Sequence, residues 1–138
     1  MLSTIAYNEA AAKNICENCG SPSAIRSQRY FRCINFKSNG NVWSKFWYDG
    51  ETPVAFYYCS RCKTHIRLIQ IAVRNDYQGK GIGKKVLYDL LARMRGEGIY
   101  KLTFRTPIDE NAYRFWAHIG ARTNSIKGND YEMEITIE

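Results

Sequence analysis

Long hydrophobic runs are missing from this sequence of 138 residues, in which no apolar stretch approaches the roughly 18 residues that span a membrane. The amino-terminal residues show no basic start followed by an apolar stretch, so we predict no secretory signal and a cytoplasmic location. Internal repeats and low-complexity tracts are also absent. The content of 45% hydrophobic and 24% charged residues excludes wholesale disorder and a collagen-like chain. The length suits one domain, or one domain with a small appendage.

Acidic residues are in the minority, with 13 Asp and Glu against 20 Lys and Arg, and the net charge is +7. A positive surface favours polyanionic partners such as nucleic acid, phosphorylated cofactors or acidic protein patches. The alternative is that a small basic protein is simply soluble. The charge therefore indicates a class of partner without selecting one.

Four of the five cysteines form two CxxC pairs, Cys16 with Cys19 and Cys59 with Cys62. In a reducing compartment such pairs indicate a metal site before they indicate disulfides. Four thiolates complete the tetrahedral shell of Zn²⁺, so we predict a structural zinc ion with these four ligands. The alternative is that they are ordinary buried thiols. Cys33 stands among apolar neighbours and is expected in a core.

Residues 24–58 read as strands separated by turn signals at Asn39-Gly40 and Asp49-Gly50. With a cysteine pair at each end, residues 1–63 are predicted to form a small antiparallel segment that resembles a zinc ribbon. Basic and aromatic residues alternate in it and are the candidate surface for a protein or nucleic-acid partner, unless the aromatics form the ribbon's own core. They are Arg26, Arg29, Arg32, Lys37 and Lys45 with Tyr30, Phe31, Trp43, Phe46, Trp47 and Tyr48.

Residues 64–138 have a different pattern, in the order strand, helix, strand, helix, strand. The helices are expected at about 82–95 and 109–118, and the strands at 65–73, 100–105 and 131–137. In the first strand the apolar parity slips between Leu68 and Ile69. Either this strand is buried on both faces or one residue is inserted as a bulge. The prediction is an α+β core.

A glycine-rich turn, QGKGIG at 78–83, stands between the first strand and the first helix. Glycines allow a bulky anion to approach the backbone, and the first N–H groups of a helix attract it. Lys80, Lys84 and Lys85 add positive charge. A diphosphate is the expected guest, although a glycine turn before a helix is often only a turn. The spacing fits neither a Walker loop nor a Rossmann fingerprint.

The run from 69 to 94 resembles the acyl-CoA-binding segment of the GNAT N-acetyltransferase superfamily, whose motif Q/R-x-x-G-x-G/A is matched by Gln78, Gly81 and Gly83. The resemblance continues to the second helix, where Ala112 and Phe115 fit, and covers about residues 64–138. It implies a mixed sheet with helices packed on it, and a bulged strand that splays from its neighbour to admit pantetheine.

The resemblance also implies acetyl-CoA as cofactor and transfer of its acetyl group to an amine, expected on a protein or nucleic-acid acceptor. A backbone N–H near Ala72 or Val73 would polarise the thioester carbonyl. The implied cofactor-binding residues are Ile71, Ala72, Val73, Gln78, Gly79, Lys80, Gly81, Ile82, Gly83, Lys84 and Asn111.

Departures from the family pattern affect the catalytic groups. Trp116 takes the place of the family's tyrosine, and an indole cannot protonate the leaving thiolate; Asp109 replaces the usual asparagine. Tyr113 is the candidate acid, while His65 and Glu51 are candidate bases. The alternatives are a catalytically inactive module that binds nucleic acid or protein, and an inhibitor or adaptor.

Overall fold

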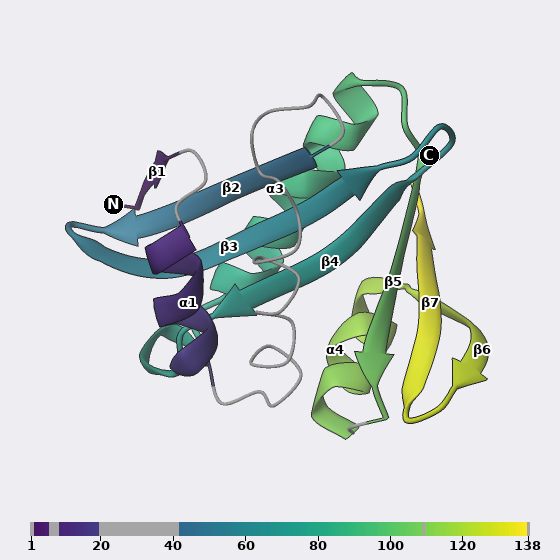
Figure 1. Ribbon diagram of the computed structural model, residues 1–138. Coiled ribbons are helices and arrows are strands. Elements are labelled where there is room, and N and C mark those ends of the chain that lie inside the picture. The colour runs from purple at the N-terminus through teal and green to yellow at the C-terminus, as the bar shows by residue number, and fades with distance from the viewer. Residues whose placement is uncertain (1, 6–8, 20–41, 109, 138) are drawn as a thin grey trace.

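The computed structural model describes residues 2–5, 9–19, 42–108 and 110–137, which form one mixed sheet with helices on both faces (Figure 1). The strand order is β1-β2-β3-β4-β5-β7-β6. The elements are β1 (Ser3–Ile5), α1 (Glu9–Glu17), β2 (Val42–Asp49), β3 (Thr52–Arg61), β4 (Ile66–Val73), the 3₁₀ helix η1 (Asn75–Tyr77), α3 (Ile82–Gly96), β5 (Lys101–Pro107), α4 (Glu110–Ile119), β6 (Arg122–Lys127) and β7 (Asp130–Thr136).

Two buried clusters lie on opposite faces of the sheet. Helix α3 presents an apolar stripe at helical spacing to one face, and α4 packs on the same cluster. Helix α1 covers part of the other face, in front of β3 and β4 in Figure 1. The α3 stripe is Val86, Leu87, Leu90, Leu91 and Met94, and the α1 cluster is Ala11, Ala12, Ile15 and Cys16 with Phe46, Phe56, Tyr58 and Ala72.

A bulge in β4 explains the slipped parity of this strand. Leu68 is opposite Cys59 and Gln70 is opposite Tyr58, so Ile69 is the extra residue. One inserted residue moves the following side chains to the other face. Leu68 before the bulge and Ile71 after it consequently contact the same core, on the α3 side of the sheet. Both predicted causes are observed, since the strand carries the bulge and is also buried on both faces, by Leu68 on the α3 side and by Ala72 on the α1 side.

Strands β4 and β5 run parallel but pair only at their first residues. Ile66 is opposite Leu102 and Arg67 is opposite Thr103. In the described residues of β4 beyond Arg67 there is no partner on β5, and Figure 1 shows the two strands diverging. Meanwhile β5 remains paired with β7 along its whole length. The sheet is therefore parted in its middle, as the family resemblance implied.

The cysteines do not form the predicted zinc site. Cys19 lies near the carboxyl end of β4. The Gln78 side chain donates hydrogen bonds both to the carbonyl of Cys19 and to the carbonyl of Val73, the last residue of β4. Cys62 lies in the turn before β4, where its N–H donates to the carbonyl of His65. The 8 residues of β4 extend roughly 25 Å between these points, whereas two sulfurs on one zinc ion lie about 4 Å apart.

The other two cysteines are also on different sides of the sheet. Cys16 is a residue of α1 and belongs to the cluster beneath that helix, while Cys59 faces the α3 side. Within the part of the chain that is described, no group of three or more His, Cys, Asp or Glu side chains is arranged to hold a metal. The structure supports the alternative reading of ordinary buried thiols for Cys16, Cys19 and Cys59, whereas the free thiol of Cys62 is half-buried.

The segment predicted as a ribbon contributes β2 and β3 to the main sheet. The expected boundary after residue 63 falls in the turn between β3 and β4, which pair with one another. The proposed partner-binding aromatics Trp43, Phe46 and Trp47 are buried in the cores, because they lie on β2 between the two helical layers. The predicted strand at 24–36, with its basic residues, lies outside the described residues.

Two strands, β1 and β6, were not predicted. All six residues of β6 are exposed, so the segment lacks the apolar alternation by which a strand is recognised. None of the described helices combines the length and apolar character needed to cross a membrane.

Candidate functional site

The turn between β4 and α3 has the geometry of an anion site. Gly79 and Gly81 have φ of +79° and +77°, a left-handed conformation that favours glycine. Gly81 is the N-cap of α3, and its carbonyl accepts the hydrogen bond of the Lys85 N–H at 3.1 Å. The N–H groups of residues 82–84 precede that first helical bond and point out of the helix end. This arrangement suits a phosphate group.

Positive side chains surround the turn. Lys80, Lys84 and Lys85 are all exposed. The Lys80 ammonium lies 5.2 Å from the centre of the Tyr77 ring, which holds it beside the turn. Together with the helix dipole, these charges give the end of α3 a potential that attracts anions.

The free edge of β4 leads directly to this turn. The Arg74 N–H donates to the Val54 carbonyl on β3, which fixes the alternation of hydrogen bonds along the ladder. By that alternation the backbone groups of Ala72 face β3, whereas those of Ile71 and Val73 face the side from which β5 has departed. Of the predicted residues 71–73, Ile71 and Val73 therefore have their backbone groups on the opened edge of β4, whereas those of Ala72 face β3.

Two glutamine side chains bind the carbonyls of this free edge. Gln70 Nε2 donates to the Ile71 carbonyl at 3.0 Å. Gln78 Nε2 donates to the Val73 carbonyl at 3.0 Å. A carbonyl oxygen has two lone pairs, so each retains capacity for a second donor.

Three elements meet at the mouth of the site. A Cβ placed on Gly83 of α3 would lie 3.7 Å from the Phe115 ring of α4 and 3.8 Å from a methyl group of Val73. Trp116 is buried; its ring packs on Phe104 of β5, with ring centres 4.0 Å apart, and makes an edge contact with Phe115 at 5.1 Å. In this fold the residue in the family's tyrosine position is thus part of the core.

The candidate catalytic residues lie apart from one another. The Tyr113 ring packs against Tyr131 of β7 at 5.2 Å and is 39% exposed. His65 lies at the closed end of the β4–β5 divergence, where its Nδ1 is 3.3 Å from the Thr64 hydroxyl. Glu51 is exposed in the turn between β2 and β3. Asn111 belongs to α4, and Asp109 lies outside the described residues.

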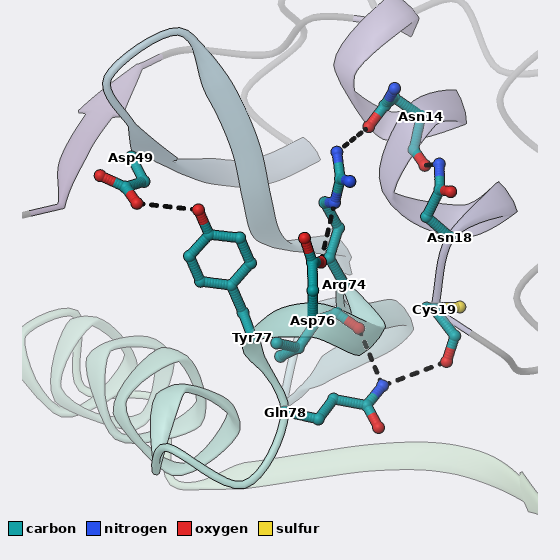
Figure 2. A network of polar contacts seen from close by, with 9 residues as sticks. Asn14, Asn18, Cys19, Asp49, Arg74, Asp76, Tyr77 and Gln78 are labelled. Atoms are coloured by element: carbon teal, nitrogen blue, oxygen red, sulfur yellow. Dashed lines mark hydrogen bonds and ion pairs between the residues drawn. The ribbon is translucent and has the colours of Figure 1, made fainter.

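Sequence reasoning missed the contacts that hold the turn in place from α1 (Figure 2). The Arg74 guanidinium donates to the Asn14 amide oxygen at 3.1 Å and to Asp76 at 3.2 Å. The Asn75 N–H donates to the Asn18 carbonyl at 2.8 Å. Arg74 and Asn14 are 60 residues apart along the chain, and Asn75 and Asn18 are similarly distant, so no local pattern reveals these two contacts.

A further contact holds the turn from the opposite side. The Tyr77 hydroxyl donates to the carboxylate of Asp49, the last residue of β2 before the β2–β3 turn, at 2.8 Å (Figure 2). The hydrogen bond to that carboxylate raises the pKa of Tyr77 above its ordinary value. The segment that precedes α3 is therefore held between α1 and the β2–β3 turn.

Comparison with known proteins agrees with this geometry. The sequence profile described as the acetyltransferase (GNAT) family matches residues 9–121, which is most of the chain. The chain belongs to the GNAT acetyltransferase family. An uncharacterized acetyltransferase from the arcA 3′ region of Streptococcus pyogenes is 33% identical over 81 residues, which are 58% of this chain and 54% of the relative. The chain thus spans about half the length of the curated relatives it matches.

Solved structures share the fold over nearly the whole chain. The ribosomal-protein-S18-alanine N-acetyltransferase of Escherichia coli has a TM-score of 0.83 at 17% identity, covering 100% of this chain and 95% of that one. The PaiA N-acetyltransferase of Thermoplasma acidophilum, solved in complex with coenzyme A, has a TM-score of 0.79 at 15% identity, with 99% of each chain covered. These likenesses confirm the predicted GNAT-like mixed sheet.

Proposed function

We propose that this GNAT chain binds acetyl-CoA and transfers the acetyl group to an amine. The observation that carries the proposal is the continuity of the free β4 edge with the glycine turn. The edge offers the amide groups of Ile71 and Val73, and the turn offers the first N–H groups of α3. A molecule with two amides at one end and a diphosphate at the other would pair its amides with the strand edge and its diphosphate with the helix N–H groups.

In the proposed complex the diphosphate rests on the N–H groups of residues 82–84, with Lys84 beside it. The pantetheine arm extends along β4 from Val73 toward the bulge and forms hydrogen bonds with the strand edge. An N–H of this edge polarises the thioester carbonyl, because a donor at that place stabilises the charge that develops on oxygen. The rate enhancement then comes mainly from placing the two reactants together.

The transfer step is direct. The neutral amine nitrogen forms a bond to the thioester carbon, the carbon–sulfur bond breaks, and coenzyme A leaves as a thiolate that takes up a proton. The amine loses a proton to solvent. Tyr113 is the candidate donor of the thiolate's proton, since the residue is partly exposed to solvent. His65 is left out of the proposal because it lies where β4 and β5 are still paired.

The acceptor is proposed as a primary amine, with protein amines the first to test. Approach from the α1 face of the sheet is favoured because α3 and α4 fill the other face beside Val73. The aromatic residues expected to bind a nucleic acid are buried, so base stacking on β2 is not part of the proposal. The zinc ion is not part of it either.

The proposal is tested by native mass spectrometry for retained coenzyme A and by thiol release from acetyl-CoA with a panel of amines and peptides. We expect tight coenzyme A binding and acceptor-dependent release, and both should be lost in Gly81→Glu, which places a carboxylate in the anion site. Tyr113→Phe should lower kcat about tenfold or more without weakening coenzyme A binding. Absence of coenzyme A binding by the unmodified protein would refute the proposal.

A second function is favoured by Trp116, whose burial against Phe104 leaves no proton donor at the family's tyrosine position. On this reading the chain binds acyl-CoA but serves as a binding module for a protein or nucleic acid. Coenzyme A binding with no thiol release for any acceptor would favour the module. Release above the hydrolysis background with one acceptor would exclude it.

A further inference from the structure

The Gln78 side chain connects two separate parts of the backbone. Its Nε2 donates to the Val73 carbonyl at the end of β4, at 3.0 Å, and to the Cys19 carbonyl just beyond α1, at 3.1 Å (Figure 2). An amide nitrogen carries two hydrogens, so one group serves both carbonyls. The side chain is thus directed at backbone groups of its own chain.

The Cys19 end of this connection is firmly placed. Cys19 is 7% exposed, and its thiol donates to the Cys16 carbonyl at 3.2 Å. Close by, the Asn75 N–H donates to the Asn18 carbonyl at 2.8 Å. The end of α1 is therefore a fixed point from which Gln78 can hold a neighbouring strand.

The Val73 end concerns the proposed cofactor site. Val73 belongs to the free edge, and its methyl group lies beside Gly83 at the start of α3. Holding its carbonyl also sets the direction of its N–H, because both belong to the same extended residue. Among the contacts drawn in Figure 2, those of Arg74 and Tyr77 hold the turn, whereas that of Gln78 holds the strand.

We propose that Gln78 is a positioning residue for acyl-CoA, fixing the end of β4 against α1 so that the Val73 amide meets the pantetheine arm. This assignment rests on the proposed function. It differs from the expectation drawn from the sequence, in which Gln78 binds the cofactor itself. If Gln78 contacted the diphosphate directly, its loss would weaken the binding of any diphosphate. If it positions β4, its loss weakens only the binding of the pantetheine arm.

The test compares coenzyme A with ADP, which carries a diphosphate but no pantetheine arm. Gln78→Met keeps the length of the side chain and removes both hydrogen bonds without adding a charge. By calorimetry we expect its dissociation constant for coenzyme A to rise about tenfold and that for ADP to stay within about twofold. Tyr77→Phe is the comparison variant: it removes a contact that holds the same turn but does not involve β4, so any weakening it causes should be equal for coenzyme A and ADP.

Hydrogen exchange of the free protein gives a readout that needs no ligand. Amides at 14–18 and 74–79 should exchange faster in Gln78→Met than in the unmodified protein, because the connection between them is lost. If that variant does not fold, Gln78→Asn replaces it, since a side chain shorter by one carbon cannot reach both carbonyls. A purely structural role would lower the melting temperature without separating coenzyme A from ADP.

Two other outcomes would contradict the positioning role of Gln78. Equal weakening of coenzyme A and ADP would make Gln78 a ligand of the diphosphate, and unchanged coenzyme A affinity or unchanged exchange would remove its positioning role. In both cases the unmodified protein still binds coenzyme A, so the proposed function stands. If the unmodified protein binds no coenzyme A, the proposed function fails and this assignment fails with it.

Discussion

Arg67 on β4 and Glu132 on β7 are joined across β5 by two hydrogen bonds, of 3.1 and 3.4 Å. Arg105 of β5 donates to the same carboxylate. Arg67 is also the residue at which β4 and β5 stop pairing. The carboxylate thus ties three strands together at the point where the sheet parts.

The first prediction concerns acid stability. Burial alone would raise the pKa of Glu132, but the hydrogen bonds from Arg67 and Arg105 outweigh it and hold the pKa below its usual value. A carboxyl whose pKa is lower in the folded state stabilises the protein above its unfolded pKa of about 4.3 and loses this effect as pH falls through the folded value. Melting temperature should therefore fall less steeply below about pH 4.5 in Glu132→Gln than in the unmodified protein. Identical slopes would contradict the prediction.

The second prediction separates two glycines of the turn. Gly81→Ala forces a left-handed alanine and should cost about 1–2 kcal/mol of stability. Gly83→Ala adds a methyl group at ordinary contact distance from Phe115 and Val73, and should leave the melting temperature unchanged or raise it, since alanine favours a helix. Thermal denaturation of the two variants tests this contrast. An equal loss of stability in both would show that the turn has another geometry.

The third prediction concerns thiol reactivity. Burial, with smaller contributions from Cys19 and Glu17, raises the pKa of Cys16 to about 12. Burial also raises the pKa of Cys59. Because the thiolate is the reactive form, both should resist a disulfide reagent at pH 8 until the protein unfolds, while the half-buried Cys62 reacts first. Peptide mapping after brief labelling of a Cys33→Ala variant measures the order, and rapid labelling of Cys59 would argue against this fold.

The fourth prediction concerns metal removal. Since the two CxxC pairs lie at opposite ends of β4, a strong chelator should leave the melting temperature within about 1 °C of its starting value. A zinc ion bound by four thiolates supplies on the order of 10 kcal/mol, and its removal would unfold the chain. Metal analysis of the purified protein accompanies the melting experiment. One zinc per chain, with unfolding on chelation, would restore the site that the structure does not support.

The fifth prediction concerns Trp116. Because its ring packs on Phe104 in the core, Trp116→Tyr would bury a hydroxyl without a partner and should lower the free energy of unfolding by about 1–3 kcal/mol. It should not raise the rate of thiol release, since the side chain at this position faces the core. Denaturant unfolding and the release assay measure the two quantities. An increase in turnover would place this position in the active site.

The parts of the fold that the sequence predicted are those with strong local signals. The helix from Ile82 follows a glycine turn and carries a regular apolar stripe, and it ends at Gly96, one residue from the predicted end. The parity slip at Ile69 predicted a bulge as one of two causes, because a single inserted residue reverses a pattern of period two.

The parts that failed depend on packing between distant segments. A CxxC spacing occurs both in the tight turns that bind a metal and at the end of a helix. Only the tertiary structure shows that Cys16 belongs to α1 and is buried beneath it. Likewise, Gln78 was recognised by its place in a motif, but its hydrogen bond to Cys19 joins residues 59 positions apart. No pattern along the chain distinguishes a side chain that binds a ligand from one that holds the backbone around it.

The divergence of β4 from β5 also creates an internal edge strand. Unpaired amide groups on such an edge are a template for strand addition by another polypeptide. An occupant of this edge protects the protein from self-association as well as from unfolding, because a ligand that binds only the native state lowers the population of every other state. If the proposed acyl-CoA site is real, the solubility and storage lifetime of the purified chain should therefore increase with the fraction of that site occupied by coenzyme A.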